Sequence, residues 1–189
     1  MRQFSAWLTG ISKGWLVLLS LLVFILFMIF VLPDQAAKAE DYSQGGDSPD
    51  MSFFYSPEKL FQMAARYGES GRQAYIRARF TFDLIFPAVY GLFLVTATSW
   101  FASRAFPIGS SWRLLNLVPA AGVLFDLLEN SAASIVMATY PDRYLLVGWL
   151  ASGFTLLKWV FVYGSFFVLL ITALNWLYKQ IKSRVVDPI

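Results

Sequence analysis

Four long apolar runs divide the chain, and few polar residues interrupt them. They cover residues 15–32, 80–101, 114–138 and 144–174. A helix needs about 20 apolar residues to cross a hydrocarbon core about 30 Å thick, so all four runs are long enough. Backbone groups in lipid must be satisfied internally, and the runs lack the alternation of barrel strands, which favours helices. The pattern predicts an all-α protein, a four-span transmembrane helical bundle.

The polar stretch 33–79 separates the first two runs. Its first half, up to Asp50, is rich in Asp, Gln, Gly and Ser, which is typical of a flexible linker. The triplet Ser56-Pro57-Glu58 then predicts a helix start, with an N-cap, a proline and an acid in the first turn. Gly68 ends this short amphipathic helix, and residues 73–79 continue helically into the second span. We expect a single membrane domain with this stretch outside the membrane.

Composition supports a membrane protein and narrows its chemistry. The chain is 58% hydrophobic and 14% charged, whereas soluble domains average about 25% charged residues. It has no cysteine and no histidine, which excludes disulfides, thiolate metal sites, Ser-His catalysis and His-ligated haem or zinc. A basic stripe for nucleic acid is also missing. We therefore expect no cofactor, no metal and no nucleic-acid partner.

Polar residues inside the third and fourth runs are the strongest functional signal. Asp126, Glu129 and Asn130 have the i, i+3, i+4 spacing that places side chains on one helix face. Lys158 lies at a similar depth in the next run, and the short connection predicts antiparallel packing. Lys158 can therefore pair with either Asp126 or Glu129. An ionisable group at this depth costs a few kcal/mol, so it usually faces the bundle and has a partner or a function.

Asp83 near the outer end of the second run, with Arg79 one turn before it, completes the candidate polar cluster. One interpretation is a clamp, in which charges pair and orient the helices. The other is a polar pocket near the membrane midplane, because two acids against Lys158 form an imbalance that a clamp does not need. A partner protein could also supply the missing cation. For Arg77 and Arg79, the simplest interpretation is a pair of interfacial arginines that reach headgroup phosphates.

Orientation follows from the basic residues. Four spans place both termini on one side, and Lys and Arg are equally numerous on the two sides, seven on each. Those on the side of the termini lie in short segments close to span ends, where the positive-inside rule applies best, whereas several of the others lie farther from a span. We expect a multi-pass cell-membrane protein with both termini cytoplasmic. An alternative is a cleaved signal peptide, since Arg2, Lys13, an apolar run and Ala37-Lys38-Ala39 have that order. The run is longer than the usual ~7–15 residues, so we favour retention.

Two segments resemble a known family. The first contains Tyr55-Ser56-Pro57-Glu58, Gly71-Arg72-Gln73-Ala74-Tyr75 and residues 79–87, and the second is Asp126-Leu127-Leu128-Glu129-Asn130. Together they resemble small four-helix prokaryotic integral membrane proteins whose function is uncharacterised, over residues 55–175. A looser, architectural likeness is to the sterol-isomerase and sigma-2-receptor-like four-helix fold, which implies acids in a lipid-facing cavity. Isomerases of that family use a histidine, which this chain lacks.

These observations support three hypotheses. We favour a non-enzymatic membrane protein that is structural or binds another membrane protein, and we assign no catalytic residue. The alternative is a protein that binds a lipid or hydrophobic small molecule, with isomerase-like proton transfer by Asp83, Asp126 or Glu129 as one form. The third is proton-coupled transport by an oligomer. A cavity beside Asp126 and Glu129 would favour the second hypothesis.

Overall fold

The computed structural model describes residues 1–186, which contain helices and no strand. The α-helices are α1 (Arg2–Ile11), α2 (Gly14–Leu26), α3 (Leu32–Ser43), α4 (Pro57–Arg79), α5 (Phe82–Ala105), α6 (Val118–Thr139) and α7 (Leu145–Val186). A π-helical segment (Phe27–Val31) joins α2 to α3, and 3₁₀ segments cover Pro49–Met51 and Ser111–Leu117. Four helical stretches are long and apolar enough to cross a membrane: Gly14–Ser43, Pro57–Ala105, Ser111–Thr139 and Leu145–Ser183. The all-α, four-span prediction is confirmed.

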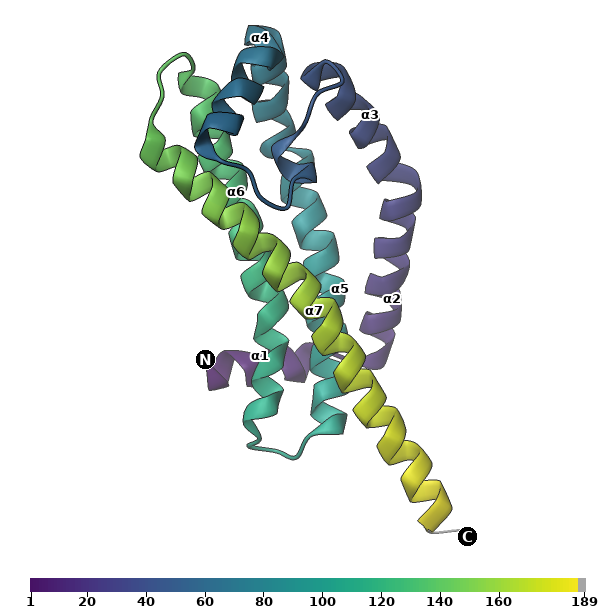
Figure 1. Ribbon diagram of the computed structural model, residues 1–189. Coiled ribbons are helices and arrows are strands. Elements are labelled where there is room, and N and C mark those ends of the chain that lie inside the picture. The colour runs from purple at the N-terminus through teal and green to yellow at the C-terminus, as the bar shows by residue number, and fades with distance from the viewer. Residues whose placement is uncertain (187–189) are drawn as a thin grey trace.

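Helices α5, α6 and α7 form the centre of the bundle, with α7 crossing the other two obliquely (Figure 1). The most extensive packing joins α6 to α7 and α5 to α7. Two of the close approaches that depend on glycine involve α7. A Cβ atom on Gly122 would lie 3.3 Å from Val162 Cγ2 of α7, and one on Gly148 would lie 2.8 Å from Pro57 Cβ of α4. Gly148 therefore brings α7 against the start of α4.

The prediction of a flexible linker from Pro33 to Asp50 is wrong for residues 33–43. These residues form α3, which continues the first span as one long, curved helix (Figure 1). Pro33 has no N–H to donate, and it follows the π-helical segment Phe27–Val31, where the regular ladder of helix hydrogen bonds is already interrupted. Lys38 Nζ lies 2.7 Å from Asp34 Oδ2, one turn apart on the helix. The helix ends where Gln44 takes a positive φ of 54°, so only residues 44–56 connect α3 to α4.

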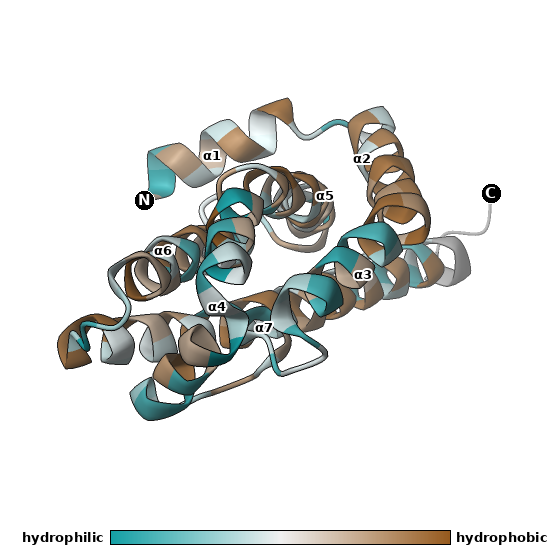
Figure 2. Ribbon diagram, turned by 90° about the horizontal axis from the view of Figure 1, so that it is seen from above, coloured by the Kyte–Doolittle hydropathy of each residue, from teal (hydrophilic) through white to brown (hydrophobic). Residues whose placement is uncertain are grey.

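Helix α4 starts as predicted, because the Ser56 side chain accepts a hydrogen bond from the Lys59 backbone N–H. Gly68, with φ 63°, breaks the helix, which then resumes and reaches Arg79. The buried side of α4 contains Leu60 and Phe61. The helix packs chiefly on α6 and also on α3 and α7. The amphipathic segment is therefore part of the bundle. Figure 2 shows that α3 and α4 carry many hydrophilic residues, whereas α2 is mostly hydrophobic.

Helix α1 lies across the opposite end of the bundle from α4 (Figure 1), an element that the sequence analysis did not predict. Ser5 and Asn116 attach it: Ser5 Oγ donates to Asn116 Oδ1 at 2.7 Å, and Asn116 Nδ2 donates to the Ser5 carbonyl at 3.1 Å. Asn116 is fully buried and also donates to Ser99 Oγ of α5. Phe4 and Trp7 on the other side of α1 are exposed, as in a helix lying at a membrane interface.

Candidate functional site

Lys158 of α7 forms an ion pair with Glu129 of α6, and both side chains are buried. Thr155, one turn before Lys158, donates from Oγ1 to Glu129 Oε1 at 2.7 Å. The Tyr55 hydroxyl lies 3.0 Å from Thr155 Oγ1. Burial, with the Glu129 carboxylate nearby, raises the pKa of Tyr55 well above its ordinary value, so this phenol stays neutral. By helical spacing Asp126 and Glu129 were both possible partners for Lys158, and the structure places Glu129 there.

Asp126, one turn before Glu129 on α6, has hydrogen bonds in place of an ion pair. The Tyr90 hydroxyl of α5 donates to Asp126 Oδ2 at 2.9 Å, and Asn130 Nδ2 lies 3.3 Å from Asp126 Oδ1. Asp126 and Lys158 both line a cavity. The Asp126 carboxylate is therefore the acid of α6 that a bound molecule could reach.

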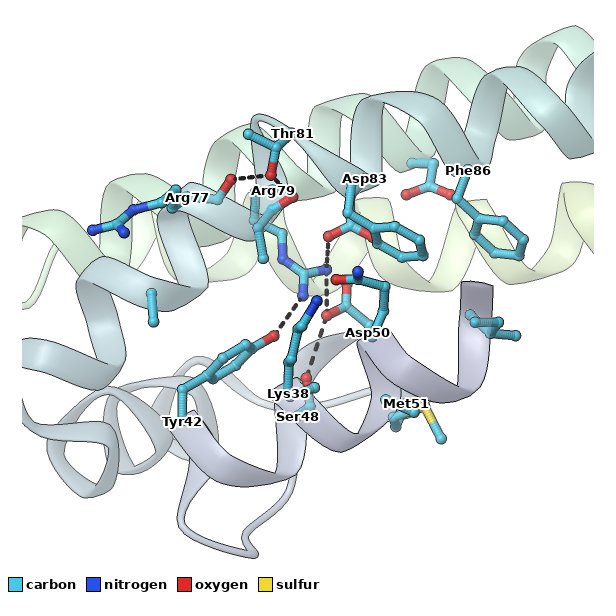
Figure 3. Close-up of a pocket in the computed structure, with 18 of the residues that line it drawn as sticks. Lys38, Tyr42, Ser48, Asp50, Met51, Arg77, Arg79, Thr81, Asp83 and Phe86 are labelled. Carbon is cyan, nitrogen blue, oxygen red and sulfur yellow. Dashed lines mark hydrogen bonds and ion pairs between the residues drawn. The ribbon is translucent and has the colours of Figure 1, made fainter. Parts of the chain in front are cut away.

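Arg79 at the end of α4 is the centre of a second group of charges (Figure 3). Its guanidinium forms ion pairs with Asp50 and with Asp83, the latter at 2.9 Å. Arg79 Nη2 also donates to the Tyr42 hydroxyl of α3 at 3.1 Å, and the guanidinium stacks over the Tyr75 ring at 4.4 Å. Only 4% of Arg79 is exposed. The interpretation of Arg79 as an interfacial arginine is therefore wrong, because it is enclosed by acids and tyrosines.

Asn130 joins the two groups. Its amide nitrogen lies 3.3 Å from the Asp83 backbone carbonyl as well as from Asp126. The structure thus brings all the predicted candidate residues into one polar cluster: Arg79, Asp83, Asp126, Glu129, Asn130 and Lys158. It holds more carboxyl than basic groups, because Asp50, Asp83, Asp126 and Glu129 face Arg79 and Lys158. Such an imbalance leaves acceptor capacity for a proton or a hydrogen-bond donor.

Several members of the cluster were not predicted. Helical spacing could have indicated some of them, whereas no pattern in the sequence indicated the others. Thr155 and Lys158 are three residues apart, so they share a face of α7. Tyr90 follows Asp83 by two helical turns on α5 and had the same signal. Tyr42 and Asp50 had no such signal, because both lie in the stretch that local composition indicated to be a linker.

A cavity of about 920 Å³ lies against this cluster, between the first span and the rest of the bundle. Its polar end includes Arg79, Asp83, Asp126 and Lys158, whereas Glu129 is not part of the lining. Its apolar wall comes from α2, the π-helical segment, α3, α5 and α7, and contains Phe24, Met28, Leu32, Phe82, Phe86, Val162 and Phe166. The cavity therefore joins a charged end to a long apolar wall.

Within residues 1–186, no group of three carboxylates is placed to share a metal ion. Asp50 and Asp83 both face the Arg79 guanidinium instead. The arrangement can orient a polar group through hydrogen bonds and charge, and it can accept or donate a proton at Asp126. No protein-family model, curated protein or solved structure matches this chain. The resemblance inferred from its segments stays a prediction.

Proposed function

We propose that this integral membrane protein binds an amphipathic, lipid-like molecule in the cavity beside its polar cluster. The observation that supports this proposal is the cavity itself. Its volume of about 920 Å³ falls in the range of about 300–1,000 Å³ found for small-molecule sites. Such sites combine apolar and aromatic walls with a few convergent polar groups, and this cavity has both.

The lining suggests how a ligand would lie. An apolar body would fit between Met28 of the first span and Val162 of α7, which are both part of the wall. The polar head would then meet Asp126 and Lys158. The Lys158 ammonium uses part of its donor capacity on Glu129, and the Asp126 carboxylate accepts from neutral groups. A head with hydroxyl-like character, able both to donate and to accept, suits this pair.

The cavity favours ligand binding over a purely structural clamp. The buried pair of Lys158 and Glu129 would be enough to orient α6 against α7. A clamp gives no reason for Asp126, Lys158 and Asp83 to line an open space, since charges packed without a void would hold the helices equally well. Binding of another membrane protein at the same place is the competing outcome, which the experiment below separates.

Filling the cavity from α3 should remove a co-purifying lipid. Ala39 lines the cavity, whereas Ala37 on the same helix is exposed and does not. We expect Ala39→Trp to lose one lipid species that lipid extraction and mass spectrometry detect with the parent protein, because the indole occupies ligand volume. Ala37→Trp, which adds the same side chain at the exposed position, should keep it. Equal lipid content in both variants, or capture of a protein and no lipid, would contradict the proposal.

We also propose that both termini are cytoplasmic. The N-terminus and the end of α7 lie at one end of the bundle, and the loop between α6 and α7 lies at the other (Figure 1). Ile189 lies outside the described residues and Tyr55 is buried, so Arg2, Lys182 and the exposed Asp142 are better markers.

Single cysteines at these positions can be labelled without background, since the chain has none. In intact cells, an impermeant thiol reagent should label Asp142→Cys and leave Arg2→Cys and Lys182→Cys unlabelled until the cells are lysed. Labelling of all three in intact cells would reject the four-span topology, and the reverse pattern would reject the orientation.

A further inference from the structure

The end of the bundle beside α1 carries basic side chains and, among the described residues, no carboxylate. Residues 1–33, 84–125 and 159–186 contain no Asp or Glu, and these stretches meet at this end (Figure 1). At the other end, Lys38 pairs with Asp34, Lys59 with Asp47 and Arg143 with Glu58. Arg66 and Arg77 there are exposed and form no ion pair among the described residues. The two ends therefore differ in whether carboxylates accompany their basic side chains.

Arg104 and Lys179 accompany a pair of tryptophans at the acid-free end. Trp100 of α5 and Trp176 of α7 have ring centroids 5.4 Å apart. Arg104 stacks over the Trp100 ring at 3.9 Å. Lys179, one turn after Trp176, donates to the Ala105 carbonyl at the end of α5.

Lys13 completes the group from the first span. It immediately precedes Gly14, and a Cβ atom on Gly14 would lie 3.3 Å from Trp100 Nε1. Lys13, Arg104 and Lys179 are all exposed. Arg104 and Lys179 each use one donor on a backbone carbonyl of α5, which leaves other N–H donors for a ligand.

We infer that Lys13, Trp100, Arg104, Trp176 and Lys179 form a binding site for the headgroup of an anionic phospholipid. We call this group the basic-aromatic site. Clustered cations next to a span attract anionic headgroups, and tryptophan is enriched at the depth of the headgroups. The site lies apart from the cavity, on other residues, so it is independent of the proposed function.

The neighbouring surface favours a lipid over a soluble phosphate. From the site, exposed apolar side chains continue along both flanking helices. Trp15 and Leu18 of α2 are 62% and 69% exposed, and Leu174 of α7 is 54% exposed. These side chains offer acyl chains a surface that inorganic phosphate would not use. One ligand can therefore contact cations with its head and α2 and α7 with its tails.

The test compares retention of two lipids by the purified full-length protein in neutral detergent. Native mass spectrometry would count bound lipid after incubation with equal amounts of palmitoyl-oleoyl phosphatidylglycerol and the corresponding phosphatidylcholine. We expect the parent protein to retain the anionic phosphatidylglycerol in preference to the phosphatidylcholine. The triple variant Lys13→Gln, Arg104→Gln, Lys179→Gln should bring the ratio of the two bound lipids down to about one. An excess of inorganic phosphate, against chloride at matched ionic strength, should leave the parent's ratio unchanged.

A matched triple variant removes the same charge from the other end: Lys38→Gln, Lys59→Gln and Arg143→Gln. It should keep the parent's preference. Should the first triple variant fail to fold, Lys13→Glu serves alone, because the Lys13 side chain makes no hydrogen bond within the described residues, and it should lower the preference several-fold. The inference is overturned if the ratio survives in the variants of the site, falls equally in the matched variant, or is abolished by phosphate.

Discussion

Replacing Lys158 with Met is expected to cause a large loss of thermal stability in detergent. Lys158 is the ion-pair partner of Glu129, which is fully buried. Without the ammonium, the Glu129 carboxylate either stays charged in an apolar interior or takes up a proton at a cost. Removing one partner of a buried pair typically costs about 3–5 kcal/mol. Thermal unfolding followed by tryptophan fluorescence measures the effect.

The double variants identify the partner. Glu129→Gln removes the orphaned charge and keeps the shape of the side chain, so Lys158→Met with Glu129→Gln should recover part of the loss. Asp126→Asn in the same background should not, because Asp126 is held by Tyr90 and Asn130. Rescue by Asp126→Asn and not by Glu129→Gln would mean that Asp126, and not Glu129, is the partner of Lys158. A stable Lys158→Met protein would mean that no buried pair exists.

The second large effect is expected at Arg79. Arg79→Met leaves Asp50 and Asp83 without their cation and removes the bond to the Tyr42 hydroxyl. By the same reasoning as for a broken buried pair, the cost is about 3–5 kcal/mol. Asp50 lies in the connection 44–56 and Tyr42 lies near the end of α3. The connection and the end of α3 should therefore become more mobile. We therefore expect a lower unfolding temperature and faster proteolytic cleavage within residues 44–56.

Arg77 provides the matched control for that variant. It lies two residues earlier on α4, is exposed and takes part in no ion pair among the described residues. Arg77→Met makes the same chemical change and should alter stability by no more than about 0.5 kcal/mol, as surface substitutions usually do. Adding Asp50→Asn and Asp83→Asn to Arg79→Met should slow the cleavage again. Equal cleavage rates in Arg77→Met and Arg79→Met would reject the central role of Arg79.

Clamp and pocket, first considered as alternatives, describe neighbouring parts of one cluster. The Lys158–Glu129 pair is enclosed and joins α6 to α7. Asp126 and Lys158 face the cavity from the same two helices. The Lys158–Glu129 pair orients α6 against α7 and thereby places Asp126 and Lys158 at the cavity wall. Stability and binding are therefore expected to depend on shared residues. For this reason the ligand test uses Ala39, which lies outside the cluster.

The sequence by itself determined the number of spans, because a helix in lipid needs a long apolar run and this chain has four such runs. It determined that Asp126, Glu129 and Asn130 share a face, since helical spacing alone decides that. The absence of histidine and cysteine also excluded whole classes of chemistry before any fold was known. These conclusions depend on residue type and spacing, which are local quantities.

Only the tertiary structure decided which acid pairs with Lys158, because Asp126 and Glu129 share a face and a small rotation of α6 against α7 separates the two outcomes. It alone placed Asp50 and Tyr42 beside Arg79, where burial against α4 and α5 orders a segment whose own composition favours no structure. The cavity was decided in the same way, since its walls come from α2, α3, α5 and α7. Contacts between residues far apart in the chain depend on helix rotation and side-chain packing, which no local pattern records.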